Sequence, residues 1–360
     1  MSDQEYMKMA IELAVKGGNR VSPNPLVGAV IVKDGEIIGY GYHEKYGMPH
    51  AEINALNSCT KAPEGATMYV TLEPCCHIGK TPPCTDAIIQ SKIKRVVIGS
   101  KDPNPLVGGK GIEILKASGI EVTHFVLEKE CVEMNKIFFH YIETGRPYVV
   151  MKYAMTLDGK IATFSGKSKW ITGDSARNHV HKSRSMYSAI MVGSRTVISD
   201  DPELTSRIPG GRNPKRIICD TNLSIPLDAR VLKNTDRIET YIATASIDKE
   251  KIETFRALGC HVLSIPRYKK HISLDILMKE VAKLGIDSIL LEGGGELNSG
   301  ALEAKIVNKL QIYIAPKIFG GKDAKTPVEG VGIDDPQNAI SFKRKEITML
   351  DQDILVEYEV

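Results

Sequence analysis

One histidine, one glutamate and two cysteines in the first hundred residues have the types and spacing of a catalytic zinc site. The segment MPHAEINAL places His50 and Glu52 at the expected start of a helix, and TLEPCCHIGKTPPC carries Cys75 and Cys84. One imidazole and two thiolates would leave the fourth zinc position open to water, whose pKa the metal lowers towards neutrality. Glu52, two residues from a ligand, is placed to relay protons and not to bind metal. The pattern predicts metal-assisted hydrolysis.

A closed structural zinc site is the alternative. Cys76 or His77 would then supply the fourth ligand, and the site would carry out no chemistry. Adjacent Cys75 and Cys76 are poorly placed to reach one tetrahedral centre together, and a structural site gives Glu52 no role. The sequence therefore favours the catalytic interpretation, with no role assigned to Cys76.

The HAE and EPC motifs resemble those of the cytidine/deoxycytidylate deaminase superfamily, in which the glutamate is the general acid/base. The common form has two residues between its cysteines, whereas the eight residues CHIGKTPP separate Cys75 from Cys84. This insertion, together with SPNPLVGAVIV, GYHEKYGMPHAE and DPNPLVGGKG, resembles the bifunctional riboflavin-biosynthesis deaminase/reductases. The resemblance covers nearly the whole chain.

For the first half, the resemblance implies a zinc-dependent pyrimidine deaminase domain over residues 1–145, with a cytidine-deaminase-like three-layer α/β fold. The side chains expected around the pyrimidine and its ribose phosphate are Asn24, His43, His77, Lys80, Asp102 and Asn104. Asparagine amides can read the edge of a heterocycle, and Lys80 can offset a phosphate charge. His43 and Lys80 are also compatible with ordinary surface positions.

The second half has weaker signals. SILLEGGGELNSGAL, at 288–302, predicts a strand, a glycine-rich turn and a helix, where backbone N–H groups can approach a phosphate. Gly293 and Gly295 are followed by Asn298 where the dinucleotide fingerprint needs glycine, so the standard motif fails. From these residues alone, an ordinary strand–helix turn is the default.

KYAMTLDGKIA, SKWITG and MVGSRTVISDDPELTSR resemble the reductase half of the same family. The resemblance implies a dihydrofolate-reductase-like domain over residues 146–360 that uses NADPH. The implied cofactor site comprises Ala154, Trp170, Thr196, Asp200, Gly294, Gly295, Glu296, Leu297, Asn298, Ser299 and Gly300. The implied substrate site comprises Lys152, Ser168, Arg184, Leu204, Arg207 and Glu292. Taken singly, either arginine is more often a surface cation, and Trp170 is as compatible with a core as with the wall of a cofactor site.

The resemblance implies two reactions. Zinc-dependent deamination of 2,5-diamino-6-(phosphoribosylamino)pyrimidin-4-one would precede NADPH-dependent reduction of the ribosyl side chain of 5-amino-6-(5-phosphoribosylamino)uracil to ribityl. A nucleotide- or RNA-editing deaminase fused to an unrelated domain would need a basic groove studded with aromatic residues. A net charge of +3 and 6% aromatic residues count against that alternative. A zinc-stapled binding module and the loss of one activity are further alternatives.

Hydrophobic periodicity supports a two-domain α/β chain. In the first half, strand and helix patterns alternate and predict a largely parallel sheet, with a hairpin turn at Asp34-Gly35 and a helix over 128–143. TGRPYV, at 144–149, predicts the boundary. In the second half, helices are expected near 174–186, 249–258, 273–284 and 296–304, before a strand-rich end.

Composition restricts the cellular setting. The 360 residues include seven cysteines but no export signal and no apolar run of about 18 residues. We therefore expect reduced thiols, one zinc ion per chain, a cytoplasmic location and no nucleic-acid or membrane partner. The family resemblance adds the expectation of a homo-oligomer.

Three features have no role in that scheme. The remaining cysteines are expected to be small buried hydrophobic residues; they are Cys59, Cys131, Cys219 and Cys260. His179 and His181 are expected on a solvated helix face. PNPLVG occurs at 23–28 and again at 103–108, either as two similar turns or as two walls of one ligand site.

Overall fold

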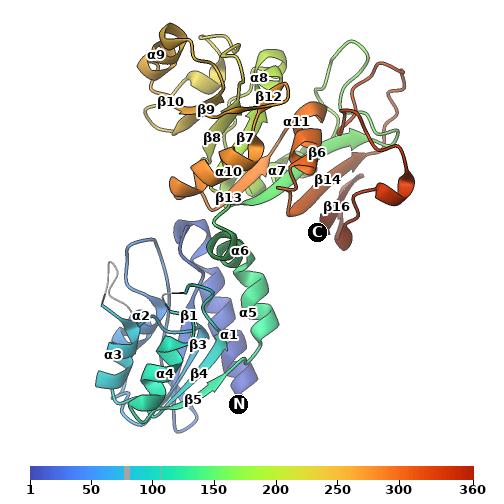
Figure 1. The fold of residues 1–360 in the computed structure, drawn as a ribbon. Coiled ribbons are helices and arrows are strands. Elements are labelled where there is room, and N and C mark those ends of the chain that lie inside the picture. Colours follow the sequence, from blue (N-terminus) through green and yellow to red (C-terminus); the bar gives the residue numbers. More distant parts are fainter. Residues whose placement is uncertain (77–81, 106) are drawn as a thin grey trace. The chain divides into compact units, whose positions relative to one another are not determined.

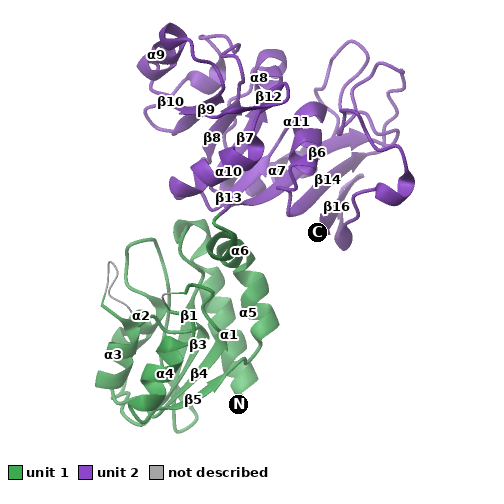
Figure 2. Ribbon diagram, in the orientation of Figure 1, with its two compact units in different colours: residues 1–145 green, residues 146–360 purple. Residues whose placement is uncertain are grey.

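The structure is a computed structural model that describes residues 1–76, 82–105 and 107–360 (Figure 1). The chain divides into two compact units, Met1–Gly145 and Arg146–Val360 (Figure 2). The division falls within TGRPYV. Within the described ranges, no helix has the length and apolar character needed to cross a membrane.

Unit 1 contains a five-stranded sheet with the order β2-β1-β3-β4-β5. Its strands are β1 (Gly28–Lys33), β2 (Glu36–Tyr42), β3 (Thr67–Leu72), β4 (Arg95–Ser100) and β5 (Glu121–His124). The pairs β3–β4 and β4–β5 are parallel, but β1 runs antiparallel to both β2 and β3. The sheet is therefore mixed, and the expectation of a largely parallel sheet was wrong for this half of it. The hairpin sets the antiparallel half, because Asp34 and Gly35 both have positive φ (54° and 80°) and form a tight turn.

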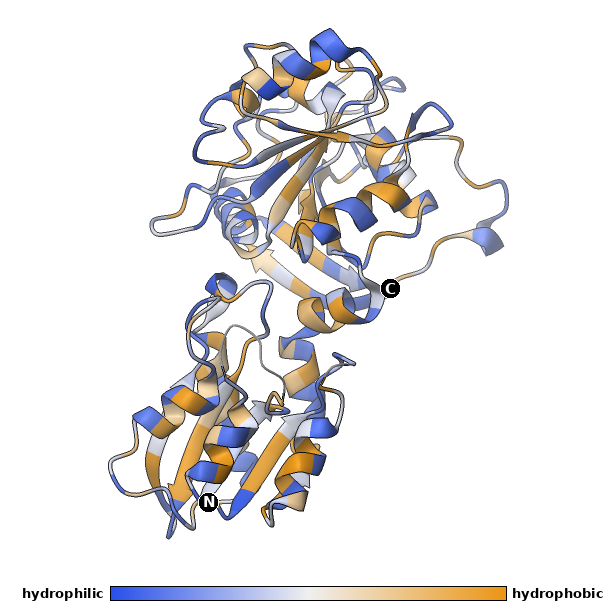
Figure 3. Cartoon of the chain, turned by 60° about the vertical axis from the view of Figure 1, so that its left-hand side comes forward, coloured by the Kyte–Doolittle hydropathy of each residue, from blue (hydrophilic) through white to orange (hydrophobic). Residues whose placement is uncertain are grey.

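Helices cover both faces of this sheet. They are α1 (Asp3–Val15), η1 (Gly18–Arg20), α2 (Ala51–Asn57), α3 (Cys84–Gln90), α4 (Lys110–Ala117), α5 (Glu128–Met134) and α6 (Lys136–Thr144). α1 and α5 pack on one face through a cluster that includes Met7 and Cys131. α2, α3 and α4 pack on the other face through a cluster that includes Ala55, Ile88 and Leu115. The apolar strands between them (Figure 3) complete the expected three-layer α/β arrangement.

The helix expected over 128–143 is interrupted. α5 ends at Met134 and α6 begins at Lys136, and Asn135 between them has φ −107° and ψ 16°. The side chain of Asn135 is 3% exposed and bonds to the backbone of Leu26. A contact with a distant loop therefore breaks the helical run, although the local pattern favours one helix.

Unit 2 contains a nine-stranded sheet with the order β10-β9-β8-β7-β13-β6-β14-β16-β15. Its strands are β6 (Tyr148–Thr156), β7 (Ala189–Gly193), β8 (Lys215–Cys219), β9 (Thr240–Thr244), β10 (His261–Ser264), β13 (Ser288–Leu291), β14 (Lys309–Ala315), β15 (Lys343–Leu350) and β16 (Asp353–Glu359). Every pair from β10 to β14 is parallel, and β16 and β15 add an antiparallel end. The buried central strands read as continuous apolar runs for that reason.

The four helices expected in unit 2 are present close to their expected ranges, as α7 (Asp174–Met186), α9 (Lys249–Ala257), α10 (Leu274–Lys283) and α11 (Gly295–Glu303). The helix α8 (Ser194–Asp200) and the short helices η2 (Arg230–Leu232) and η3 (Pro336–Asn338) were not expected. The short strands β11 (Arg267–Tyr268) and β12 (His271–Ile272) form a hairpin. One core cluster contains residues of α10 and α11, and another contains residues of α8 and α9. The carboxyl ends of β6, β7, β8 and β13 share one edge of the sheet, because these strands are parallel.

Candidate functional site

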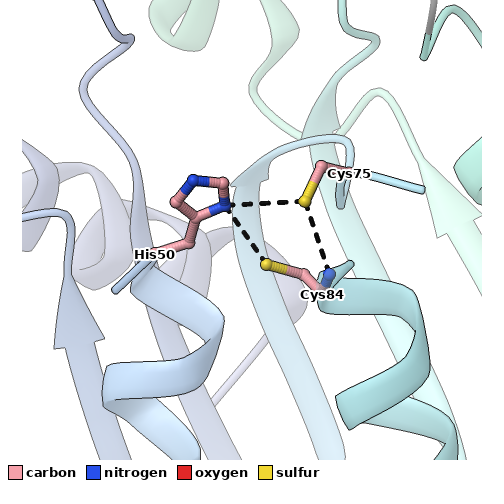
Figure 4. Close-up of side chains that lie close together, drawn as sticks. All are labelled: His50, Cys75 and Cys84. Carbon is pink, nitrogen blue, oxygen red and sulfur yellow. Dashed lines mark hydrogen bonds between the residues drawn. The ribbon is translucent and has the colours of Figure 1, made fainter. Parts of the chain in front are cut away.

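Three side chains of unit 1 meet at the ends of three elements (Figure 4). His50 Nδ1 lies 3.5 Å from Cys75 Sγ and 3.3 Å from Cys84 Sγ, and all three ligand atoms lie within 4.8 Å of one another. His50 precedes α2, Cys75 follows β3, and Cys84 is the first residue of α3. Cys75 and Cys84, which are nine positions apart, are thus brought together with His50 by three different elements.

This triangle fits zinc. Bonds of about 2.0 to 2.3 Å in a tetrahedral centre place ligand atoms about 3.5 Å apart, which matches both distances from His50. A hydrogen bond from Cys84, together with one from His50, lowers the pKa of the Cys75 thiol despite its burial, and the same hydrogen bond raises the pKa of Cys84, so Cys75 is the thiolate of the pair. A thiol of low pKa is readily deprotonated to the thiolate that binds metal.

Cys76 is not part of the triangle. It is partly buried, and burial, with the charge of Glu73, raises the pKa of its thiol. Among the described residues the metal-ligating group consists of His50, Cys75 and Cys84 alone. His77, the other ligand considered for a closed site, lies outside the described residues.

Glu52 lies in the first turn of α2 and is 3% exposed. Burial, reinforced by the charge of Cys75, raises the pKa of its carboxyl group to about 7. The carboxylate also hydrogen-bonds to the Cys84 thiol. A carboxyl group beside the metal triangle and close to neutrality in pKa can both accept and donate a proton.

His43 is 2% exposed, so the alternative of an ordinary surface position is wrong. Its Nδ1 lies 3.1 Å from the Pro49 carbonyl oxygen, and its Nε2 lies 3.2 Å from the amide nitrogen of Asn24. A neutral ring that donates from Nδ1 and accepts at Nε2 satisfies both contacts. Burial lowers the pKa of His43, which favours this neutral form. Its ring meets that of His50 edge to face, with 5.5 Å between centroids, so Asn24 and His43 lie next to the triangle.

The other predicted substrate residues of unit 1 follow β4. The carboxylate of Asp102 accepts the backbone N–H of Asn104 at 2.8 Å. Because β4 is parallel to β3, this segment leaves the sheet at the same edge as Cys75. Lys80, like His77, lies outside the described residues.

Unit 2 contains a cavity of about 1560 Å³. Its lining includes every predicted reductase substrate residue: Lys152, Ser168, Arg184, Leu204, Arg207 and Glu292. It also includes nine of the predicted cofactor residues: Ala154, Trp170, Thr196, Asp200, Gly294, Gly295, Glu296, Leu297 and Gly300. Residues that are 148 positions apart in the chain are thus brought to one cavity.

Two of the predicted cofactor residues, both within α11, have a different placement. Asn298 and Ser299 are not among the residues described as lining the cavity. Asn298 is fully buried, and its amide donates to the carbonyl oxygen of Pro327 at 2.8 Å. Gly295 meets the same stretch, because a Cβ there would lie 2.5 Å from the side chain of Glu329. The sequence of this turn therefore also reflects packing against residues 326–329.

Three charged side chains form a buried cluster in the cavity wall. Two nitrogens of Arg184 donate to the two carboxylate oxygens of Glu292 at 2.7 and 2.8 Å, and Lys152 Nζ lies 3.8 Å from Glu292. Burial alone would raise the pKa of Glu292, but the charges of Arg184 and Lys152 outweigh it and bring the pKa to about 2. Burial lowers the pKa of Lys152, and Glu292 only partly offsets this.

Sequence reasoning missed several cavity residues. His181 lines the cavity, and His179 Nδ1 lies 2.8 Å from the hydroxyl oxygen of Tyr313, so the solvated helix face expected for both histidines was wrong. His181 precedes Arg184 by three residues, and that helical spacing was the available signal. Thr221 follows β8 and also lines the cavity. Its signal was its position after a buried parallel strand.

Two family models match the chain. The cytidine and deoxycytidylate deaminase zinc-binding region matches residues 1–100, and the RibD C-terminal domain matches residues 147–356. The first match contains the metal triangle and Glu52. The second contains the cavity.

Full-length relatives show the same combination. The chain is 53% identical to the riboflavin biosynthesis protein RibD of Actinobacillus pleuropneumoniae, over 100% of this chain and 96% of the relative. It is 40% identical to the protein of that name from Escherichia coli, over 98% of each. A crystal structure of a diaminohydroxyphosphoribosylaminopyrimidine deaminase/5-amino-6-(5-phosphoribosylamino)uracil reductase from Thermotoga maritima matches with a TM-score of 0.88 and 40% identity, over 99% of this chain and 98% of that one. A structure of Acinetobacter baumannii RibD matches with a TM-score of 0.90 and 37% identity, over 99% and 98%.

Proposed function

The chain belongs to the family of bifunctional riboflavin-biosynthesis deaminase/reductases, and we propose that its two sites act in sequence on one phosphoribosylamino-pyrimidine. Unit 1 would deaminate 2,5-diamino-6-(phosphoribosylamino)pyrimidin-4-one. Unit 2 would then reduce the ribosyl side chain of 5-amino-6-(5-phosphoribosylamino)uracil to ribityl. The observation that carries the proposal is the buried Glu52 beside the His50–Cys75–Cys84 triangle, in a chain that also contains the charged cavity.

In unit 1, His50, Cys75 and Cys84 would hold one zinc ion. Zinc bound there would act as a Lewis acid and lower the pKa of bound water from about 15.7 to about 7. Glu52 would take the proton from the attacking water and pass it to the departing ammonia, since it is the carboxyl group beside the triangle. His43 and Asn24 would orient the pyrimidine from the other side of His50.

The cavity of unit 2 has room for two ligands. Its volume of about 1560 Å³ exceeds the range of about 300 to 1000 Å³ that is usual for a single small-molecule site. A reduced nicotinamide, which we propose to be NADPH, supplies a hydride when bound. Gly294, just before α11, and Thr196, in the first turn of α8, would line the dinucleotide, leaving the wall with Lys152 and Glu292 for the sugar.

Arg184 and Arg207, which both line this cavity, differ in how many hydrogen bonds their guanidinium groups already make. Arg184 already donates to both oxygens of Glu292 and to the carbonyl oxygen of Thr205. Arg207 is 55% exposed and only approaches Glu203, at 3.7 Å. We therefore propose Arg207 as the phosphate contact, because a guanidinium with free donors binds phosphate oxygens strongly. Arg184 would instead hold Glu292 in place for the ribose hydroxyls.

The order of the two reactions can be tested by supplying the diaminopyrimidine with and without NADPH. Ammonia release and NADPH oxidation would be measured separately. We expect ammonia to form without NADPH, and NADPH oxidation to require the deaminated product. Oxidation of NADPH while the amine is retained would contradict the order.

A Glu52→Gln variant tests the assignment of the proton-transfer group. We expect ammonia release to fall by about 10² to 10⁴-fold, the contribution typical of a general acid/base. Reduction of the deaminated pyrimidine by the same variant should match the unaltered protein, which controls for folding of the chain. Full ammonia release by the variant would refute the mechanism.

A further inference from the structure

The repeated PNPLVG segments are each held by a buried polar side chain. In the first copy, at 23–28, the amide of Asn135 accepts the N–H of Leu26 and donates to its carbonyl oxygen, both at 2.8 Å. The N–H of Gly28 donates to the hydroxyl oxygen of Thr71 at 3.2 Å. The first loop is thus tied to β3 and to the break between α5 and α6.

The second copy, at 103–108, lies in the sequence between residues whose backbone N–H groups bond to the side chain of Glu73. Glu73 accepts the backbone N–H of Asp102 at 3.3 Å, of Gly109 at 2.9 Å and of Ile112 at 3.2 Å. These groups flank the loop on both sides and extend into the first turn of α4. Residue 106 lies outside the described part of the chain.

The contact around Glu73 is close as well as polar. Its side chain is 3% exposed, and a Cβ added at Gly111 would lie 2.3 Å from the Pro74 carbonyl oxygen and 3.2 Å from a Glu73 oxygen. Among the described residues, no ion pair involving Glu73 is present. The three backbone N–H groups are therefore its hydrogen-bond partners, and the two carboxyl oxygens together have the acceptor capacity for all three.

Glu73 also connects the second loop to the metal ligands. It stands two residues before Cys75 and continues the pairing of β3 with β4, because its N–H donates to the Ser100 carbonyl oxygen at 2.9 Å. The segment that it holds carries Asp102 and Asn104, which the family resemblance places among the side chains around the pyrimidine. A shift of Cys75 relative to that loop would have to break contacts of Glu73.

We propose that Glu73 is a positioning residue of the deaminase site, which fixes the loop carrying Asp102 and Asn104 at a set distance from Cys75. The inference rests on the proposed function for the identity of the substrate. Its structural part, the hold on residues 102–112, is independent of that function. The repeated segments then share one feature, which is that each is held by its own buried polar side chain.

A Glu73→Gln variant tests this role in the full-length, zinc-loaded protein. Glutamine keeps the size but replaces one acceptor oxygen with an NH₂ group, which would face a backbone N–H and cannot accept from it. The matched control is Glu64→Gln, at an exposed carboxylate that pairs with Lys92 in the same unit. Glu73→Asp, which keeps the charge but shortens the reach, is the second variant if the glutamine protein does not fold.

Two readouts separate positioning from general stability. Amide hydrogen exchange of residues 102–112 should accelerate by about tenfold or more in Glu73→Gln without substrate, while β1 and the zinc content stay unchanged. The KM for deamination should rise by about tenfold, with a smaller change in kcat, because Glu52 and the metal ligands are untouched. Glu73→Asp should show both effects to a lesser degree, and Glu64→Gln neither.

The outcomes distinguish the two proposals. Unchanged exchange and unchanged KM in Glu73→Gln would overturn the positioning role, as would an equal loss of activity and zinc. If the unaltered protein released no ammonia from the diaminopyrimidine, the proposed function would fail. The exchange of residues 102–112 would still decide whether Glu73 holds the loop.

Discussion

Each unit has a largely buried glutamate that holds part of its candidate site in place, Glu73 in unit 1 and Glu292 in unit 2, but the hydrogen-bond partners of the two differ in kind. In unit 1, Glu73 is surrounded by backbone N–H groups from one stretch of chain. In unit 2, Glu292 is paired with the side chains of Arg184 and Lys152. The first arrangement immobilises a backbone segment, whereas the second holds side chains that lie on different elements.

This difference bears on how each site would meet its ligand. Asp102, Gly109 and Ile112 donate their backbone N–H groups to the Glu73 side chain without any ligand, so little ordering of these three residues remains to be done on binding. A cluster of one carboxylate and two cations can exchange partners when a charged or hydroxylated ligand enters. We therefore expect the activity of unit 1 to be most sensitive to substitution of its metal ligands and of the side chain that holds its backbone. The activity and stability of unit 2 should be most sensitive to substitutions that change the charge of the Glu292 cluster.

The largest expected effect is on the metal site of unit 1. Cys75→Ser should remove zinc and abolish ammonia release, while reduction of the deaminated pyrimidine continues. Cys76→Ser is the matched control, because this neighbouring thiol is outside the triangle. Metal content and both activities would be measured on each protein. Loss of zinc from Cys76→Ser, or its retention in Cys75→Ser, would contradict the ligand assignment.

The second expected effect is on the charge cluster of unit 2. Glu292→Gln leaves Arg184 and Lys152 buried without their counter-charge, and breaking such a pair from one side costs about 3 to 5 kcal/mol. We expect a loss of that size in the unfolding free energy of unit 2, together with loss of reduction. Trp170 is the only tryptophan, so its fluorescence reports on unit 2. Ammonia release by unit 1 is the internal control, and an unchanged unit 2 transition would show that the pair is not needed.

A smaller effect is expected from pH. The pKa of Glu292 is about 2 in the folded protein and is 4.5 for an ordinary glutamate. Since the folded value is depressed, the stabilisation is complete above about pH 4.5 and is lost as the pH falls towards 2. It amounts to about 3 kcal/mol. Urea unfolding followed at Trp170 should show this loss in the unaltered protein, and the difference from Glu292→Gln should shrink over that range. A constant difference would argue against an ionised Glu292.

The smallest expected effect concerns phosphate binding in unit 2. Arg207→Ala should raise the KM for the phosphorylated pyrimidine about tenfold, since charge-assisted hydrogen bonds of this kind are worth a few kcal/mol at most. Stability should hardly change, because Arg207 is half-exposed. Arg237→Ala, at an exposed arginine beside Asp236, is the control. A fall in stability with no change in KM would reverse the roles proposed for Arg207 and Arg184.

The two sites also differ in how far the sequence predicts them. His50, Cys75 and Cys84 stand at the starts and ends of adjacent elements, so their spacing alone indicates a metal site. Arg184 and Glu292 are 108 positions apart, and only the strand order of the large sheet brings them together. The roles assigned to them in advance depended on family resemblance for that reason.

Other features could not be predicted because their causes are tertiary. The pattern over 128–143 favours one helix, and the bond from Asn135 to Leu26 overrides it. In the sequence, Glu73 is simply the first residue of the EPC motif. Its role becomes visible only from its hydrogen bonds to Asp102, Gly109 and Ile112, which are distant in the chain. His181 reads as one of several polar residues on α7, because helical periodicity does not say which polar face meets a cavity.

The hydrogen bonds of Glu73 and Asn135 have a practical consequence for dividing the chain by protein engineering. The match to the zinc-binding family model ends at residue 100, so a truncated deaminase unit could be designed to end there. A fragment ending there would lack Gly109, Ile112 and Asn135, and would leave the Glu73 carboxylate buried or exposed without its partners. A separately expressed deaminase unit should extend to Gly145, where the compact unit ends.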